Sequence, residues 1–209
     1  MAVAELKPVR SARKPKGEGH ARRGEILEAA QRIFVECGYE GATIRKIADE
    51  VGVSSTALYM HFRDKAEILH EICENAFQQL LETDLDIIER PVPAGEKVRA
   101  ILEAYMKFGF EHPNAYRLVF LTRPQEAEEA RDVAQRLGRE VFDRFEACVN
   151  ELADEGRLKT TPKVAAQVLW AGCHGIVALI ITKPYFDWAG RPELAQTMLD
   201  TLFEGLVRT

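Results

Sequence analysis

Cysteines are few in this sequence, and none is placed as part of a pair. Cys37, Cys73, Cys148 and Cys173 are separated by 36, 75 and 25 residues, so no C-x-x-C motif exists. This spacing excludes a zinc ribbon and a thioredoxin-like redox motif. The chain also begins without the charged region and apolar run of a secretory signal peptide. We therefore expect reduced, buried thiols in a cytoplasmic protein, because disulfides are rare there.

Other absences restrict the fold and the chemistry. No stretch alternates apolar and polar residues over the length of a strand, and no internal repeat is present. The sequence also lacks a phosphate-binding glycine loop, a carboxylate cluster and metal-ligand spacing. We predict an all-α protein that is not an enzyme and needs no cofactor or metal. The alternative is a haem or metal sensor, whose candidate ligands are His112, His174, Cys148 and Cys173.

Charge is distributed unevenly along the chain. The net charge is −5, yet residues 1–63 hold 11 Lys and Arg against 8 Asp and Glu. Residues 1–19 are basic and rich in proline and glycine, which predicts a flexible arm. The arm has two alternative roles, a solubility tail or a contact with a nucleic-acid groove or backbone. A basic N-terminal part on an acidic body indicates a polyanionic partner for that part alone.

Apolar residues at helical spacing, interrupted by proline and glycine, predict about nine helices. Thr43, Ser54 and Asp64 each stand at an N-cap position, and Gly38 and Gly52 stand where helices end. The expected helices cover about 20–38, 44–51, 55–61, a long segment from Lys65, 95–111, 114–122, 125–155, 162–182 and 191–207.

The two short helices on either side of Gly52 carry the clearest functional signal. Ala48 is small where the helices must cross, and apolar neighbours fix the crossing. This arrangement is typical of a helix-turn-helix, whose second helix lies in the DNA major groove. A purely structural helical hairpin needs similar residues, so the pattern alone leaves both interpretations open.

Two motifs surround this turn, Gly38-Tyr39-x-Gly41-x-Thr43 and Leu58-Tyr59-x-His61-Phe62-x-x-Lys65-x-x-Ile68-Leu69. Through these motifs the chain resembles the TetR family of transcriptional repressors over about residues 20–70. The resemblance implies an N-terminal helix-turn-helix domain over 20–66 and a helical ligand-binding and dimerisation domain over 67–209. It implies a homodimeric repressor that a small molecule releases from a palindromic operator. One departure is Thr56, where the family often has glycine or proline.

The side chains of the helix pair suit the two kinds of DNA contact. Tyr59 and Lys65 offer a hydroxyl and an ammonium group, which suit backbone phosphates. Arg45 can hold guanine O6 and N7 together. A helical enzyme that merely resembles a DNA-binding protein is disfavoured, because it would not need phosphate-binding side chains at this spacing. The predicted DNA contacts are Thr43, Arg45, Ser54, Ser55, Thr56, Ala57, Tyr59, His61 and Lys65.

The segment Val164–Ile181 is apolar and just long enough to span a membrane. Because it carries Gln167 and His174, we expect a buried helix and no membrane. TetR-like proteins dimerise through their last two helices, which raises the expectation of an interface here. The predicted interface residues are Val168, Gly172, Ile176, Leu179, Leu194, Met198, Leu202 and Phe203.

The stretch Trp170-Ala-Gly-Cys-His174-Gly resembles the Trp-His-Gly signature of one subclass of the family, and we expect His174 to be a hydrogen-bonded structural residue. Aromatic side chains between residues 100 and 180 predict a cavity for a hydrophobic or aromatic effector. The alternative is a DNA-binding dimer that is regulated without a small-molecule pocket. The predicted cavity residues are Tyr105, Phe108, His112, Tyr116, Phe120, Phe142, Phe145, Trp170 and His174.

Overall fold

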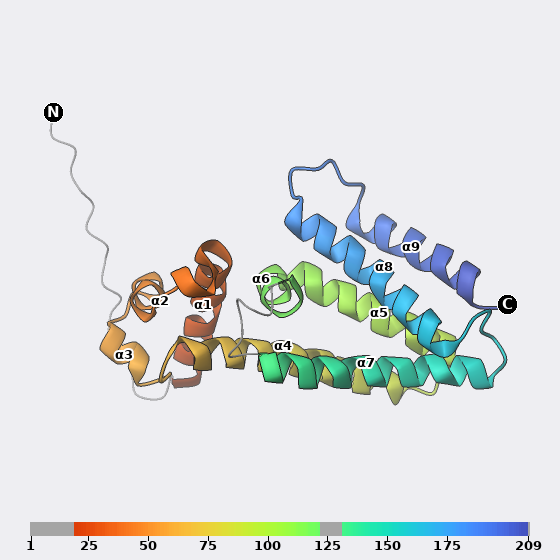
Figure 1. Cartoon of the computed structure of the whole chain (residues 1–209), viewed down its shortest axis with the longest axis horizontal. Helices are drawn as coiled ribbons and strands as arrows, with labels where there is room; N and C mark the ends of the chain where they lie inside the picture. Colours follow the sequence, from red (N-terminus) through yellow and green to blue (C-terminus); the bar gives the residue numbers. More distant parts are fainter. Residues whose placement is uncertain (1–18, 122–130, 209) are drawn as a thin grey trace.

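A computed structural model describes residues 19–121 and 131–208, and every regular element in these ranges is helical, as predicted. The predicted arm lies almost wholly outside the described residues. Figure 1 shows a small group of helices at one end of an elongated body. The elements are α1 (Gly19–Gly41), α2 (Ile44–Val51), α3 (Ser55–Tyr59), α4 (Lys65–Ile88), α5 (Ala94–Glu111), α6 (Pro113–Tyr116), the π-helical turn η1 (Arg117–Leu121), α7 (Arg131–Asp154), α8 (Pro162–Thr182) and α9 (Arg191–Leu206).

The N-terminal helices begin at the capping residues that the sequence predicts. Thr43 Oγ1 accepts a hydrogen bond from the Lys46 backbone N–H at 3.2 Å, and Ser54 Oγ accepts one from Ala57 at 3.1 Å. The Asp64 carboxylate caps α4 in the same way. These bonds satisfy backbone donors that a helix start leaves free, so each short helix has a defined first residue.

Two glycines end helices in the left-handed region. Gly38 interrupts α1 with a φ of 70°, and Gly52 ends α2 with a φ of 77°. The helix after Gly52 is shorter than predicted, because α3 ends at Tyr59 rather than at residue 61. The chain leaves α3 early so that Phe62 can enter the core before α4 begins.

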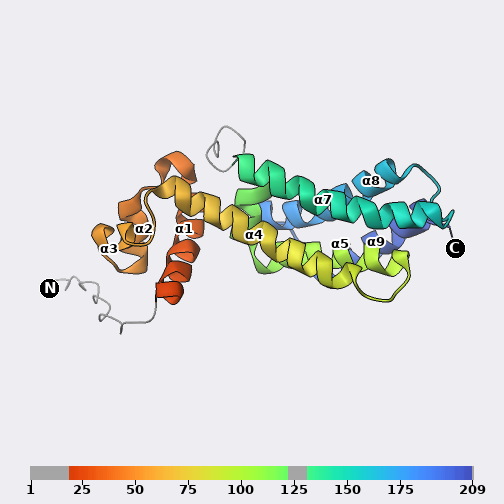
Figure 2. The same cartoon turned by 90° about the horizontal axis from the view of Figure 1, so that it is seen from below.

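The long helix α4 connects the two parts of the molecule. It has 24 residues, which corresponds to about 36 Å at ~1.5 Å per residue. Its N-terminal end packs on α1, and the rest lies along α7 and α5. Figure 2 shows α4 and α7 side by side along the body. A rotation of α4 against the body would therefore move the N-terminal helices.

One predicted helix differs in the structure. The segment expected as a single α-helix over 114–122 is the short α6 followed by the π-helical turn η1. Tyr116 and Phe120 lie on one side of this segment, where the Tyr116 ring stacks on His174 and the Phe120 ring meets His174 edge-on. π-Helical turns are often found where a protein positions functional side chains. The helix predicted over 125–155 is described from Arg131 to Asp154, and its beginning lies outside the described residues.

Among the described helices, α8 is the one that is long and apolar enough to cross a membrane. The packing of α8 within the protein explains its apolar composition. It contacts α5, α7 and α9 and buries residues such as Leu169, Cys173 and Val177. Helix α8 therefore forms part of the core of the C-terminal body.

Candidate nucleic-acid interface and internal cavity

Helices α2 and α3 form a helix-turn-helix at the far end of the molecule (Figure 1). Ile47, Ala48 and Leu58 are fully buried between these helices and α1. The small Ala48 lets the helices approach, and the Val53 N–H donates to the Ala48 carbonyl at 2.9 Å across the turn. The buried face fixes the crossing angle, so the opposite face is presented to solvent as a rigid unit.

The outward face carries most of the predicted DNA contacts. The Arg45 side chain is 86% exposed and only loosely paired with Asp49 at 3.8 Å. Tyr59 is 56% exposed. Ser55 and His61 are also predicted contacts, but they are half-buried and therefore less accessible to DNA than the other predicted contacts on these helices. The predicted contacts that are exposed to solvent are Thr43, Arg45, Ser54, Thr56, Ala57 and Tyr59.

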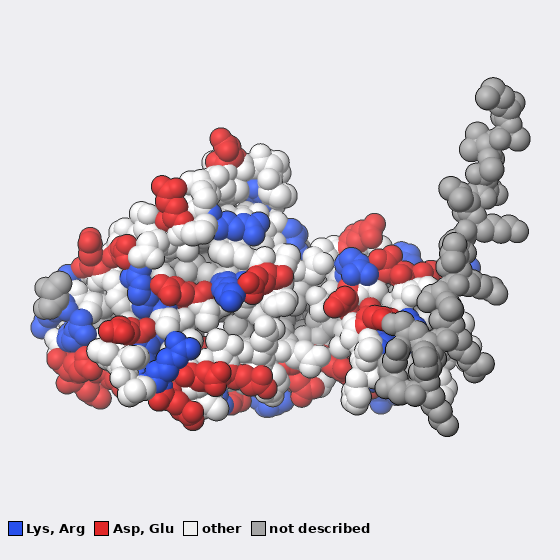
Figure 3. All heavy atoms as spheres, turned by 180° about the vertical axis from the view of Figure 1, so that it is seen from behind, with Lys and Arg blue, Asp and Glu red and all other residues white. Residues whose placement is uncertain are grey.

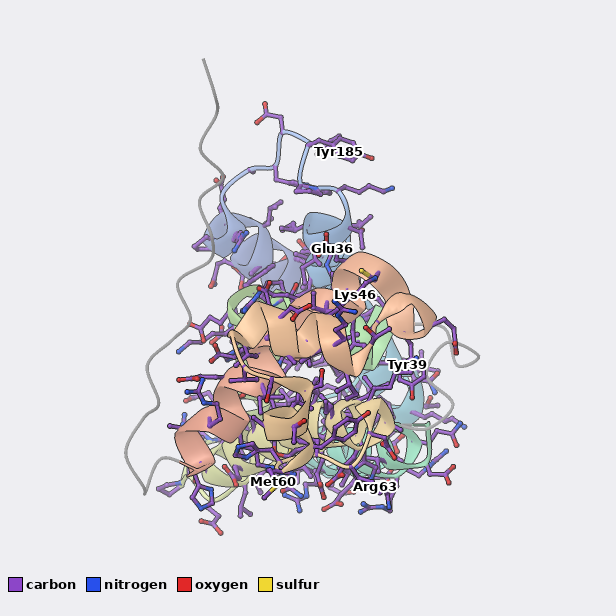
Figure 4. All side chains as sticks on the ribbon, turned by 90° about the vertical axis from the view of Figure 1, so that its left-hand side faces the viewer. Glu36, Tyr39, Lys46, Met60, Arg63 and Tyr185 are labelled. Carbon is purple, nitrogen blue, oxygen red and sulfur yellow. The ribbon has the colours of Figure 1, made fainter. Side chains whose placement is uncertain are left out.

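The structure adds Met60 and Arg63 to this end of the molecule, where both lie along one edge (Figure 4). Met60 is 82% exposed, which is unusual for an apolar side chain, and the Arg63 side chain is 81% exposed beside Asp64. Figure 3 shows basic and acidic side chains mixed over the rest of the visible surface. The exposure of Met60 could have been inferred from the sequence, because Met60 directly follows α3 and is not on the helix face that carries the buried Leu58.

Lys65 is held against the end of α1. Its Nζ donates to the Tyr39 carbonyl at 2.8 Å and lies 4.1 Å from the centre of the Tyr39 ring. An ammonium group has three protons, so two remain for an anion. The side chain is half-buried and preorganised rather than freely solvated.

Arg23 joins the helix-turn-helix to α4, and the sequence analysis did not select it. Its guanidinium donates to the His61 carbonyl and to Glu71, with a distance of 2.8 Å from Nε to Oε1. It also lies 4.0 Å from the centre of the Phe62 ring. The hydrogen bond with Glu71 raises the pKa of Arg23. The contact connects α1, the segment after α3 and α4.

The C-terminal body contains a cavity of about 1160 Å³ between α4, α5, η1, α7 and α8. Aromatic rings form part of its wall. Phe142 meets Trp170 edge to face at 5.7 Å, and Tyr105 meets Phe120 at 5.6 Å. A volume above about 300 Å³ with an aromatic lining is typical of small-molecule sites. The predicted residues that line it are Tyr105, Phe120, Phe142, Phe145 and Trp170.

Four predicted cavity residues, Phe108, His112, Tyr116 and His174, do not line it. The cavity ends near Tyr105 because α5 packs tightly beyond this level. A Cβ atom on Gly109 would lie only 2.4 Å from Val177 and 3.0 Å from Tyr116. His112 lies instead at the exposed end of α5, with Nε2 3.4 Å from Gln79.

His174 is hydrogen-bonded behind the cavity wall. Its Nδ1 lies 2.7 Å from the Tyr116 hydroxyl and 3.1 Å from the Tyr105 hydroxyl. The two hydroxyls are 2.8 Å apart. Burial lowers the pKa of His174 and raises the pKa of both tyrosines, so all three groups are neutral at pH 7. The described residues contain no cluster of three or more metal-ligating side chains.

Asp84 is the buried carboxyl group among the residues that line this cavity, and sequence reasoning missed it. The residue lines the cavity, is 3% exposed, and its Oδ2 has no hydrogen-bond partner among the described residues. Burial raises its pKa to about 7, an effect that Arg144 partly offsets. A signal existed in the sequence, because Asp84 continues the apolar stripe of α4 at helical spacing from Leu80 and Leu81.

The predicted dimer residues differ in how exposed they are in the single chain. Val168 and Leu179 are exposed on α8, at 38% and 49%. Gly172 instead faces α9 of the same chain, where an added Cβ would lie 2.7 Å from Leu202 and 3.1 Å from Met198. The remaining predicted interface residues, Ile176, Leu194, Met198, Leu202 and Phe203, are half-buried.

Known proteins share both parts of this chain. The profile of the tetR family of bacterial regulatory proteins matches residues 26–72, and the tetracyclin repressor-like C-terminal domain matches residues 98–202. The transcriptional activator FasR of Mycolicibacterium smegmatis is 32% identical over 126 residues, which are 58% of each chain. The repressor KstR2 of Mycobacterium tuberculosis is 31% identical over 109 residues, or 52% of this chain and 54% of KstR2. The chain thus spans little more than half the length of these two relatives.

Solved structures share the fold. The ketosteroid transcriptional regulator KstR2 of Mycobacterium tuberculosis superposes with a TM-score of 0.74 at 21% identity, covering 90% of this chain and 96% of KstR2. SmeT in complex with triclosan gives a TM-score of 0.72 at 24% identity, covering 90% of this chain and 92% of SmeT. With both family profiles matched on a helix-turn-helix and a helical body, the chain belongs to the TetR family of transcriptional regulators.

Proposed function

We propose that this protein is a ligand-responsive transcriptional repressor of the cytoplasm that binds a palindromic operator as a homodimer and is released by a small hydrophobic or aromatic effector. The observation that carries the proposal is the position of α4. Its N-terminal end supports the helix-turn-helix, while its Phe77, Leu80 and Asp84 line the cavity. SmeT, a protein of the same fold, was solved with triclosan bound.

DNA binding would use the exposed face of α2 and α3. Arg45 would read a base, and the Tyr59 hydroxyl and Lys65 ammonium would contact phosphates. Thr43 at the start of α2 adds a hydroxyl and free backbone donors, which favour an anion. In a twofold dimer, the two α3 helices would lie about 34–36 Å apart, one turn of DNA.

Dimerisation would use the exposed face of α8 together with α9. Val164, Val168 and Leu179 are apolar and exposed on α8. An obligate interface of this type should bury more than about 2,000 Å² in total. We expect Leu179→Glu to convert the dimer into monomers in light scattering. Leu85→Glu is the matched control, because Leu85 on α4 is 46% exposed and Leu179 is 49% exposed. A monomeric wild-type protein at micromolar concentration would contradict the interface.

The switch would be mechanical. An effector in the cavity would contact α4 on one side and α5, α7 and α8 on the others, and would favour one tilt of α4. Because Arg23 ties α1 and the residues after α3 to α4, the tilt would move both recognition helices. A 100-fold loss of operator affinity requires about 2.7 kcal/mol of coupling, which is within the usual range.

The proposal can be tested by measuring the binding of both the operator DNA and the small-molecule effector. An operator selected from random DNA gives one ligand, and a screen of lipophilic compounds by Trp170 fluorescence gives the other. Trp170 lies on the cavity wall, and Trp188→Phe would leave it as the only tryptophan of the chain. Linkage requires that operator and effector weaken each other's binding by the same factor. Equal effector affinity with and without operator would instead support a DNA-binding dimer that is not regulated through this cavity.

A further inference from the structure

The buried carboxylate of Asp84 is the most unusual group in the C-terminal body. Its neighbours on the same face of α4 are Leu80, Leu81 and Ile87, all buried. A charged group in such surroundings is costly unless a hydrogen bond or an opposite charge compensates it. Oδ2 has neither within hydrogen-bonding distance among the described residues.

The nearby cation does not compensate Asp84 directly. Arg144 donates to Glu140 at 2.8 Å and to the Leu81 carbonyl at 3.3 Å, and it forms no ion pair with Asp84 within 4 Å. Asp84 is instead a lining residue of the cavity, and its unpaired Oδ2 is covered in this structure. A ligand donor in the cavity would reach this unpaired oxygen once the Asp84 side chain turns toward the cavity.

The remaining wall favours a cation as that donor. Tyr105, Phe120, Phe142 and Trp170 line the same cavity as Asp84, and aromatic ring faces attract cations. The formal charges of the other lining residues cancel, because Asp143 and Glu146 oppose Arg139 and Lys163. Of the lining carboxylates, Asp84 alone is buried.

We propose that the cavity selects organic cations, namely ligands with an apolar or aromatic body and a protonated nitrogen that donates to Asp84. This inference rests on the proposed function only in taking the cavity as a ligand site. An anionic ligand would face an unpaired carboxylate, and a ligand without a donor would leave Asp84 unsatisfied.

The test compares three probes with the same ten-carbon chain, decylammonium, decanol and decanoate, below their aggregation concentrations. Binding to the full chain is measured by calorimetry and by Trp170 fluorescence in the Trp188→Phe background. We expect decylammonium to bind at one site per chain, at least about tenfold more tightly than decanol and more tightly still than decanoate. A tenfold difference corresponds to about 1.4 kcal/mol.

Asp84→Asn keeps the shape and removes the charge. We expect this variant to bind decylammonium and decanol with similar affinity, so the tenfold preference disappears. Asp143→Asn is the matched control, because Asp143 also lines the cavity but is exposed. It should keep the preference. The melting temperature of each variant without ligand confirms that it is folded.

Three results would overturn the inference: equal or tighter binding of decanol or decanoate to the wild type, an unchanged preference in Asp84→Asn, or no binding of decylammonium. Operator release is measured separately with the selected DNA. If decylammonium binds through Asp84 and operator affinity stays constant, the cation site stands and the proposed switch fails.

Discussion

The two ends of the molecule differ in whether their notable polar side chains are exposed or buried. At the helix-turn-helix, apolar residues such as Ile47 and Leu58 are buried, and most of the side chains predicted to contact DNA face solvent. At the cavity, aromatic residues form the wall and one carboxylate, Asp84, is inside. The first arrangement suits a large, hydrated polyanion, and the second suits a small molecule that loses its water on binding. Helix α4 belongs to both ends, so the comparison can be tested by changing one end and measuring the other.

The largest effect is expected from filling the cavity. Ala134→Trp places an indole where the effector would lie, and should weaken operator binding by about 100-fold, or ~2.7 kcal/mol. Fluorescence anisotropy with the selected operator measures the loss. Ala147→Trp on the same helix is exposed and should leave affinity unchanged. Equal affinity of both variants would show that the two ends are not coupled through α4.

The next effect separates base contacts from phosphate contacts at the DNA end. Arg45→Ala should cost about 1–3 kcal/mol and relax the preference at one base pair. Lys65→Ala should instead weaken binding to all sequences alike and make the salt dependence shallower than the expected slope of about −5. Competition assays on operator variants at several salt concentrations distinguish the two. A loss of discrimination in Lys65→Ala would contradict its phosphate role.

A stability effect of similar or smaller size is expected at the cavity end. Because Asp84 is buried without a partner, Asp84→Leu should raise the free energy of unfolding at neutral pH by about 1–3 kcal/mol. Denaturation with urea measures the change. Most buried-residue substitutions destabilise, so a gain here would show that the residue is kept for a reason other than folding. A destabilised Asp84→Leu would indicate a structural role.

The pH dependence of this effect has a defined sign. The pKa of Asp84 rises on folding from 3.8 to about 7. The folded state therefore binds more protons than the unfolded state between these values, and this contribution to stability is complete below pH 3.8 and lost as the pH rises through about 7. Asp84→Leu should remove this part of the pH profile. The gain in stability over the wild type should therefore grow between pH 5 and pH 8.

The smallest expected effects are those of the local caps. Ser54→Ala removes the hydroxyl that accepts from the Ala57 N–H and should lower the free energy of unfolding by about 1 kcal/mol. Ser55→Ala, one residue later, is the control. It should lower the free energy of unfolding by less, because Ser54 and not Ser55 is the N-cap residue of α3. Thermal unfolding compares the two. Equal losses would mean that capping does not define the start of α3.

The helix-turn-helix could be predicted because its determinants are close together in sequence. Thr43, Gly52 and Ser54 act within one turn of their own positions, through capping and left-handed backbone conformation. The cavity depends on residues from five elements, and its end at Tyr105 is set by the contact of Gly109 with Val177 and Tyr116. Spacing within one helix cannot show where another helix closes a space, so Phe108 and His112 were assigned to a cavity that stops before them.

The sequence by itself determined the all-α class, the capped starts of α2, α3 and α4, and the resemblance that identifies the helix-turn-helix domain, because these follow from local propensity, capping and residue spacing. Only the tertiary structure decided that Arg23 joins α1 to α4, that Gly172 lets α8 approach α9 of the same chain, and that Asp84 is an unpaired carboxylate on a cavity wall. Each depends on side chains from helices far apart in the chain. Burial and pairing are properties of the packed arrangement, since a residue's neighbours across a helix interface are absent from its local sequence.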